Sequence, residues 1–148
     1  MEFKPVITCD NYKKVDGFRT SNSDIEKLEM GVKKNKDNNR DEIIEKLFKL
    51  DGGFDELPVN RVLDMTILLC EVSLYFKEAY RMPKLYDENN LTISRVGLQG
   101  DAMNIEICKS NKNLDKDIIA LAHEFNKQGE LLGERFKVLA EILGELGY

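Results

Sequence analysis

The chain has 148 residues and a formal net charge of −5, with a sequence pI near 5.1. Its 42% hydrophobic and 33% charged residues are typical of a globular protein and argue against disorder of the whole chain. The acidic balance argues against a broad nucleic-acid surface, because such a surface needs clustered Lys and Arg. We therefore expect no nucleic-acid partner, and the simplest organisation is a single domain over residues 1–148.

Three cysteines, Cys9, Cys70 and Cys108, are scattered along the chain without a Cys-x-x-Cys pair. An odd and scattered set favours a reducing compartment over a disulfide framework. The first five residues contain no basic region followed by an apolar one, so we expect no secretion signal. The sequence therefore predicts a cytoplasmic protein.

Short apolar runs alternate with polar turns in the N-terminal third. Residues 5–9 and 27–34 have the composition and alternation of strands, and the polar tract 35–41 predicts a turn. Residues 43–50 carry apolar side chains at helical spacing, which slightly favours a helix. The same run also suits the second strand of a hairpin, so both alternatives stay open.

The longest apolar stretch, residues 58–81, predicts a helix of about 24 residues and roughly 35 Å. Its apolar side chains cover most of a helical wheel, so we expect a central helix that is packed on nearly every side. Pro58 suits the first helical position, where its missing N–H costs nothing. Asp64, Glu71 and Lys77 interrupt the run, which argues against a membrane span and a membrane partner.

Arg61 projects along a line of this helix that is otherwise apolar. In one interpretation it pairs with Asp64, three residues on, and lays its stem along apolar surface. In the other, its guanidinium is held in a pocket and receives an anionic group. Ion pairs with a structural role are the commoner of the two in proteins.

Two short strands with a glycine-containing connection follow the central helix. Residues 92–96 and 103–108 alternate as strands do. The connection, residues 97–102, contains two glycines, and a hairpin turn explains them sufficiently.

The last third keeps apolar residues at a three-four spacing from Leu114 to Leu146. The pattern lapses near Gly129, so it fits either one long helix or two helices joined there. Gly129 and Gly133 are four residues apart, which suits close approach of another helix. We expect that helix to be the central one, with a second copy of the chain as the alternative.

Together these elements predict an α+β fold. A long central helix and C-terminal helices are expected to pack on a small, mainly antiparallel sheet.

The standard catalytic sets are mostly absent from the sequence. His123 is the only histidine, which argues against multi-histidine metal sites and against Ser-His-Asp or Cys-His catalysis. Neither common glycine-rich phosphate loop is present. The many acidic residues are more typical of a solvated surface than of a metal site, so we predict no metal and no cofactor.

What remains is a set of polar residues beside the apolar framework. Arg and Lys suit anionic groups, Gln and Asn suit bases or amides, and Tyr suits stacking. Lys77 and Tyr80 belong to this set. The eight residues to which we assign candidate ligand-binding roles are Arg61, Asp64, Arg81, Tyr86, Arg95, Gln99, Asp101 and Asn104.

Short motifs at both ends and in the middle of the chain belong together: Lys4-Pro5-Val6-Ile7, Asn11-Tyr12 to Asp16-Gly17, Arg61-Val62-Leu63-Asp64, Phe76 to Arg81, Leu85-Tyr86-Asp87, Gly97 to Asn104, Gly133-Glu134-Arg135 and Gly147-Tyr148. Together they resemble an uncharacterised bacterial family of similar length that carries a domain-of-unknown-function label. The resemblance implies a shared fold and supplies no activity. Relatives have an aromatic, strand-like pattern where this chain has residues 22–57, which shifts our prediction for residues 27–50 toward a hairpin.

The leading functional hypothesis is a non-enzymatic binder of a small anionic or nucleotide-like ligand. Its pocket would lie near residues 97–104 and use Arg61, Arg81, Arg95 and Gln99.

Two further hypotheses come from different classes. One is a hydrolase-type enzyme with Asp101 or Asp64 as general base. The other is an interaction protein whose C-terminal helix face, including Leu132, Phe136 and Leu139, joins a partner or a second copy in a homo-oligomer.

Overall fold

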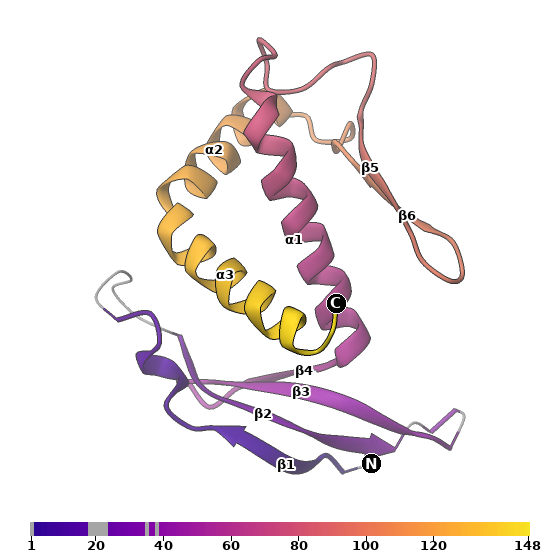
Figure 1. Cartoon of the computed structure of the whole chain (residues 1–148), viewed down its shortest axis with the longest axis vertical. Coiled ribbons are helices and arrows are strands. Elements are labelled where there is room, and N and C mark those ends of the chain that lie inside the picture. The colour runs from indigo at the N-terminus through magenta and orange to yellow at the C-terminus, as the bar shows by residue number, and fades with distance from the viewer. Residues whose placement is uncertain (1, 18–23, 35, 38) are drawn as a thin grey trace. The chain divides into compact units, whose positions relative to one another are not determined.

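The computed structural model describes residues 2–17, 24–34, 36–37 and 39–148. The chain divides into two compact units, Met1–Thr66 and Ile67–Tyr148, which we describe one at a time. Helix α1 (Val59–Ala79) runs from the first unit into the second (Figure 1). This division does not test the single-domain organisation, which stays a prediction.

A four-stranded antiparallel sheet forms most of the first unit (Figure 1). Each strand pairs with the one before it in the chain, so the strand order is β1-β2-β3-β4. The elements are β1 (Lys4–Cys9), a 3-10 turn (Tyr12–Lys14), β2 (Ile25–Lys34), β3 (Asp41–Lys49) and β4 (Phe54–Pro58).

Strand β1 approaches β2 so closely at Gly31 that no side chain fits there. Gly31 is paired with Pro5, and a Cβ on Gly31 would lie 2.0 Å from the carbonyl oxygen of Lys4. The register shifts between Pro5 and Ile7, as it does at a β-bulge. A proline and a bulge on an edge strand disfavour pairing with another chain, so this edge is protected.

Residues 43–50 lie almost entirely in strand β3, so the helix that their spacing slightly favoured is wrong and the hairpin alternative is confirmed. Both faces of β3 carry apolar side chains, with Ile43 and Leu47 on one face and Ile44 and Phe48 on the other. Such a two-sided strand places apolar residues one, three and four positions apart, which imitates a helix. Of the predicted polar turn, residues 35 and 38 lie outside the described residues.

Pro58 is the last residue of strand β4, and helix α1 begins one residue later. The prediction that Pro58 is the first residue of the helix is therefore wrong. Pro58 pairs with Ile44 of β3 on an edge strand, where a residue without an N–H is tolerated. Helix α1 begins at Val59 and ends at Ala79, two residues or fewer from the predicted bounds.

Helix α1 is less buried than its sequence predicts. Ala79 is its only buried residue, and Leu63 and Leu74 are 58% and 60% exposed. In the second unit, α1 packs through Tyr75 and Phe76 against the hydrophobic core. A helical wheel counts apolar side chains but not the neighbours that cover them, and the expected packing on nearly every side is therefore wrong.

The second unit contains the rest of α1, a two-stranded antiparallel hairpin and two C-terminal helices. These elements are β5 (Thr92–Gly97), β6 (Ala102–Glu106), α2 (Leu114–Lys127) and α3 (Gly129–Glu145). The core of this unit is a cluster of Tyr86, Ile107 and Ile118. The glycine-containing turn and the α+β class are confirmed.

The C-terminal pattern corresponds to two helices and not to one. Gln128 separates α2 from α3, with φ −94° and ψ 12°. Its N–H donates to the carbonyl oxygen of Glu124, and its own carbonyl oxygen accepts the N–H of Leu132. Backbone hydrogen bonding therefore continues on both sides of a single non-helical residue.

Candidate functional site

Arg61 and Asp64 lie on the part of α1 that belongs to the first unit. A guanidinium nitrogen of Arg61 donates to Oδ2 of Asp64 at 3.0 Å. The Arg61 side chain is 63% exposed, so solvent screens this pair and it contributes little to stability. The structure therefore agrees with the first interpretation of Arg61, in which it pairs with Asp64.

Arg81 follows the end of α1 and is also paired. Its guanidinium lies 3.0 Å from a carboxylate oxygen of Glu78 and 5.8 Å from the ring centroid of Tyr80. Both members of the ion pair are exposed. As with Arg61, a carboxylate three residues away already occupies the cation.

Tyr86 is an anchor between the loop after α1 and helix α2. Its hydroxyl donates to Oδ1 of Asp115 at 2.6 Å, and its ring belongs to the core cluster. The hydrogen bond to the carboxylate favours the neutral phenol and raises the pKa of Tyr86.

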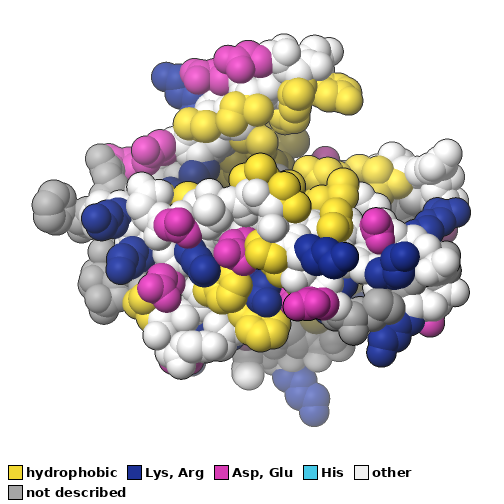
Figure 2. Space-filling model, turned by 90° about the horizontal axis from the view of Figure 1, so that it is seen from below, with side chains coloured by type: hydrophobic (Ala, Val, Ile, Leu, Met, Phe, Trp, Pro, Cys, Tyr) yellow, Lys and Arg dark blue, Asp and Glu magenta, His cyan; other side chains and the backbone are white. Residues whose placement is uncertain are grey.

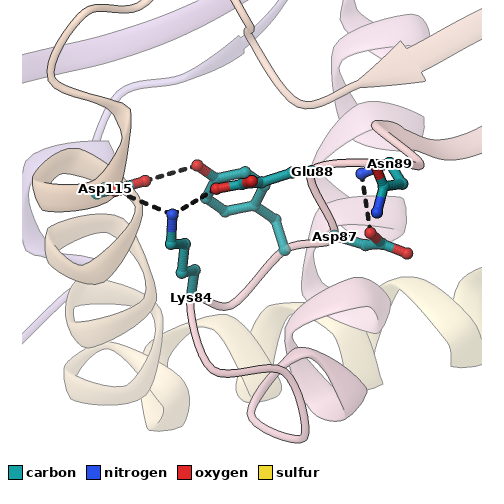
Figure 3. A network of polar contacts seen from close by, with 6 residues as sticks. Lys84, Asp87, Glu88, Asn89 and Asp115 are labelled. Atoms are coloured by element: carbon teal, nitrogen blue, oxygen red, sulfur yellow. Dashed lines mark hydrogen bonds and ion pairs between the residues drawn. The ribbon is translucent and has the colours of Figure 1, made fainter.

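Figure 3 shows the charged groups around this hydroxyl. Lys84 donates to Glu88 and lies 3.9 Å from Oδ2 of Asp115, and the hydrogen bond to Glu88 raises the pKa of Lys84. An open pocket of about 350 Å³ lies over residues 82–89. Lys84, the cation of this pocket, already has two carboxylate partners. An incoming anion would therefore gain little from it.

The remaining four candidates share the β5–β6 hairpin. Arg95 of β5 is paired in register with Asn104 of β6, and Gln99 and Asp101 lie in the turn. All four are exposed. One Asp101 carboxylate oxygen accepts the N–H of Ala102 at 2.7 Å. The structure therefore brings half of the candidate residues onto one hairpin, and none of the described hydrogen bonds or ion pairs links them to Arg81 or Tyr86.

A larger concave site lies elsewhere in the second unit. It is an open groove of about 750 Å³ lined by all three helices of this unit. Helix α1 and the residue after it contribute one face between Ser73 and Tyr80, α2 contributes Ala122 to Asn126, and α3 contributes Gly129 to Phe136. The volume is within the range of small-molecule sites.

The walls of the groove are aromatic and aliphatic. The rings of Phe76 and Phe125 lie 5.4 Å apart between centroids and are tilted by 51°. Leu132 and Phe136, four residues apart on α3, extend the apolar lining, and both are half-buried. A ligand in the groove would therefore bury hydrocarbon surface against existing walls.

Gly129 and Gly133 also line the groove, and no described residue packs closely against them. A Cβ on either residue would have no described heavy atom of another element within 4 Å. The close approach of the central helix that we expected at these glycines is therefore absent, and approach by a second copy of the chain stays a prediction. Their missing side chains instead leave space in the groove.

Lys77 is the cation of the groove. Among the described residues it has no ion pair or hydrogen bond, and no acidic side chain is part of the groove lining. The hydroxyl of Ser73 donates to the carbonyl oxygen of Leu69 at 2.9 Å, which leaves Tyr80 and Asn126 as the other polar side chains free to meet a ligand. An ammonium without a carboxylate partner can donate charge-assisted hydrogen bonds to an anionic group.

The sequence itself distinguishes Lys77 from the two arginines. Arg61 and Arg81 each have an acidic residue three positions away, whereas Lys77 has none three or four positions away on either side. On a helix, these are the positions at which a cation finds its partner. A lysine on an apolar helix without such a partner is a candidate ligand contact.

A second group of Lys and Phe residues lies on the sheet of the first unit. The Lys46 ammonium lies 3.9, 5.0 and 5.1 Å from the ring centroids of Phe54, Phe48 and Phe3. It is also 3.5 Å from Oε1 of Glu56. We call these five residues the sheet cluster.

Further ion pairs surround the sheet cluster. Lys33 donates to Oε2 of Glu56 at 2.7 Å, and this hydrogen bond lowers the pKa of Glu56. Lys27 lies 3.3 Å from Glu29. Basic and acidic side chains likewise lie next to one another, with hydrophobic ones between them, on the face of the molecule in Figure 2. Lys27, Lys33 and Lys46 thus each have a carboxylate partner.

The part of the chain that the structure describes holds no group of three His, Cys, Asp or Glu side chains placed to bind a metal ion. Within the same residues, no helix has the length and apolarity needed to cross a membrane.

Comparison with known proteins gives one match. The chain belongs to DUF6530, a family of unknown function whose model matches residues 1–148. No curated protein and no solved structure matches the chain. The motif resemblance implies a family of unknown function, and this part of the prediction is confirmed. The family assigns no activity.

Proposed function

We propose that this chain, whose family has no assigned function, is a non-enzymatic binder of a small organic anion, and that the anion lies in the groove of the second unit. The observation that carries the proposal is Lys77, a cation without a partner among the described residues, in an apolar groove of about 750 Å³. Ligand sites typically combine such apolar walls with a few polar groups that orient the ligand.

The proposal keeps the class of ligand that the sequence predicts and changes the residues that bind it. Arg61 and Arg81 are each held by a carboxylate, and Arg95 stands on an exposed hairpin face. We assign the anion contact to Lys77 and polar contacts to Tyr80 and Asn126.

Isothermal titration with 8-anilinonaphthalene-1-sulfonate tests the proposal, because this probe joins an aromatic body to one negative charge. We expect Lys77→Gln to weaken binding about fivefold, since a charge-assisted contact is lost. The matched control is Lys116→Gln, an exposed lysine of α2 that is not part of the groove lining, and it should leave the affinity unchanged. Equal affinities for the two variants, or no binding to the wild type, would contradict the proposal.

Self-association through α3 is a second candidate function, and one observation favours it. Val138, Ile142 and Leu146 are four residues apart and are 49%, 49% and 67% exposed. Val138 and Ile142 of α3 and Leu146, which directly follows it, form an apolar stripe on a side different from the groove residues of α3. Light scattering should show a dimer that Ile142→Glu dissociates, and a wild-type monomer at high concentration would remove this candidate.

The enzyme hypothesis gains no comparable support. Asp64 is held by Arg61, Asp101 accepts the N–H of its neighbour, and neither lines the groove.

We also propose a cytoplasmic location and a bacterial source. Cys9, Cys70 and Cys108 are all free thiols, which suits a reducing compartment. The bacterial source rests on the motif resemblance alone. Cell fractionation with an antibody to the native protein tests the location.

A further inference from the structure

We infer that the ligand of the groove is an amphiphilic monoanion, a carboxylate with a hydrocarbon body, and not a nucleotide. This inference rests on the proposed function, because it names the chemical class of the ligand for the same groove. It is drawn from the number of cations in the groove, the chemistry of its walls and the space at its glycines.

The charge of the groove matches a single negative charge. Lys77 is the one cation among the described lining residues, and no arginine is present there. A phosphate monoester carries about −1.5 to −2 charges at pH 7 and is commonly held by Arg forks or by several donors. A carboxylate carries one charge, which a single ammonium can neutralise.

The walls match hydrocarbon better than a nucleobase. Phe76, Phe125, Leu132 and Phe136 offer apolar surface, while Asn126 is the only amide side chain in the described lining. A base has several donors and acceptors on its edges, and burying them without partners disfavours binding. A hydrocarbon chain has no such groups.

The space at the glycines suits a chain that lies along α3. Gly129 and Gly133 are about one helical turn apart, and a Cβ on either would meet no neighbour within 4 Å among the described residues. Because the backbone is bare there, hydrocarbon can approach α3 directly. We therefore place the carboxylate at Lys77 and the chain between α3 and Phe125.

The first test compares matched ligands on the wild-type chain by isothermal titration. Decanoate and decanol share the same body and differ in charge, and AMP supplies a nucleotide. We expect decanoate to bind at least tenfold more tightly than decanol and more tightly than AMP. Shortening the chain to octanoate should weaken binding about tenfold, since each buried methylene changes the affinity about three- to fourfold.

The second test assigns the charge to Lys77. In Lys77→Gln, the affinity for decanoate should fall to that for decanol, and the affinity for decanol should not change. Lys116→Gln should leave both affinities as they are. Unchanged decanoate binding in Lys77→Gln would overturn the inference, because binding would then be partition into apolar surface without recognition of the anion.

The third test blocks the groove without removing any contact. Gly133→Met places a side chain into open space within the groove, and Gly144→Met makes the same change on α3 outside the groove lining. We expect Gly133→Met to abolish decanoate binding and Gly144→Met to retain it. Circular dichroism of both variants checks that they are folded, which separates blocking from loss of structure.

The outcomes distinguish this inference from the proposed function. AMP could bind more tightly than decanoate, and Gly133→Met could abolish the binding of AMP. The groove would then bind an anion, as the proposed function says, but the inference of an amphiphilic monoanion would be wrong. If neither decanoate nor the naphthalene sulfonate binds, both fail. If Gly133→Met instead changes the subunit number by light scattering, the groove is filled by a second copy of the chain, and the inference is overturned.

Discussion

The sheet cluster and the groove use the same residue types in opposite ways. Lys46 of the sheet cluster lies against three phenylalanine rings and has Glu56 as its counter-ion. Lys77 lines the groove together with aromatic side chains, but no carboxylate is part of the described groove lining. Lys46 therefore has a counter-ion within the protein, whereas Lys77 has none among the described residues.

Glycine shows the same contrast. At Gly31 the space where a side chain would begin is filled by the backbone of β1, whereas at Gly133 that space is open. A lysine, a phenylalanine or a glycine therefore does not reveal its role by its type. Its role depends on whether neighbouring groups already pair with its charge or fill the space beside it. The following predictions test this difference.

The largest effect is expected at Gly31. In Gly31→Ala the new Cβ would overlap the carbonyl oxygen of Lys4, so β1 must shift away from β2. We expect the free energy of unfolding to fall by about 2–3 kcal/mol, as for other overpacked sites. Urea unfolding measures this change. A loss below about 0.5 kcal/mol, the size of an ordinary surface substitution, would show that β1 does not lie tightly against β2.

A somewhat smaller effect is expected when the sheet cluster loses its anion. Glu56→Gln leaves Lys33 and Lys46 without their shared counter-ion, and the Lys46 side chain is only 14% exposed. We expect a loss of about 1–2 kcal/mol at pH 7. Asp55→Asn is the matched control, because the exposed Asp55–Lys49 pair should contribute less than about 1 kcal/mol.

The pH dependence of Glu56→Gln sharpens this prediction. The pKa of Glu56 is lowered from its ordinary value of 4.5, chiefly by the hydrogen bond from Lys33. Its stabilising contribution is therefore present above about pH 4.5 and is lost as the pH falls through the folded-state pKa. The unfolding free energies of wild type and variant should converge in acid. A constant difference down to pH 2 would contradict the ion-pair explanation.

The fold was predictable where one periodicity dominates a segment. Alternation identified the strands around residues 97–102, and three-four spacing identified the C-terminal helices, because both patterns are local. Strand β3 escaped because apolar residues on both of its faces hide the alternation. Its identity is set by pairing with β2, a contact between segments that a local pattern does not contain.

The candidate site was predictable only in part. The spacing of Phe125, Leu132 and Phe136 predicts an apolar face, and the polar set included Lys77 and Tyr80. Whether such a face is covered or open depends on the distance between helices, which no spacing specifies. Arg61 and Arg81 are cations, but each is paired with a carboxylate three residues away, and these carboxylates are visible in the sequence.

Tyr86 tests this distinction, because the sequence placed it among the ligand contacts and the structure shows a satisfied anchor. Tyr86→Phe removes the hydrogen bond to Asp115, and we expect a loss of about 1 kcal/mol at pH 7. The raised pKa of Tyr86 means that this contribution is present below its ordinary value of 10.0 and is lost as the pH rises through the folded-state pKa. Tyr148→Phe, at a side chain that is 92% exposed, serves as control. Equal stabilities of both variants would contradict the anchor.

The smallest effect, and the only stabilising one, is expected in the groove. Gly133→Ala removes the entropic cost of a glycine inside a helix, and its Cβ meets open space, so the free energy of unfolding should rise by about 0.5–1 kcal/mol. Thermal and urea unfolding measure the change, with Gly144→Ala of the same helix as control. A gain at Gly144 but a loss at Gly133 would mean that something already fills the space beside Gly133. The groove would then be as closed as the sheet at Gly31, and Lys77 would have a partner that is not a small anion.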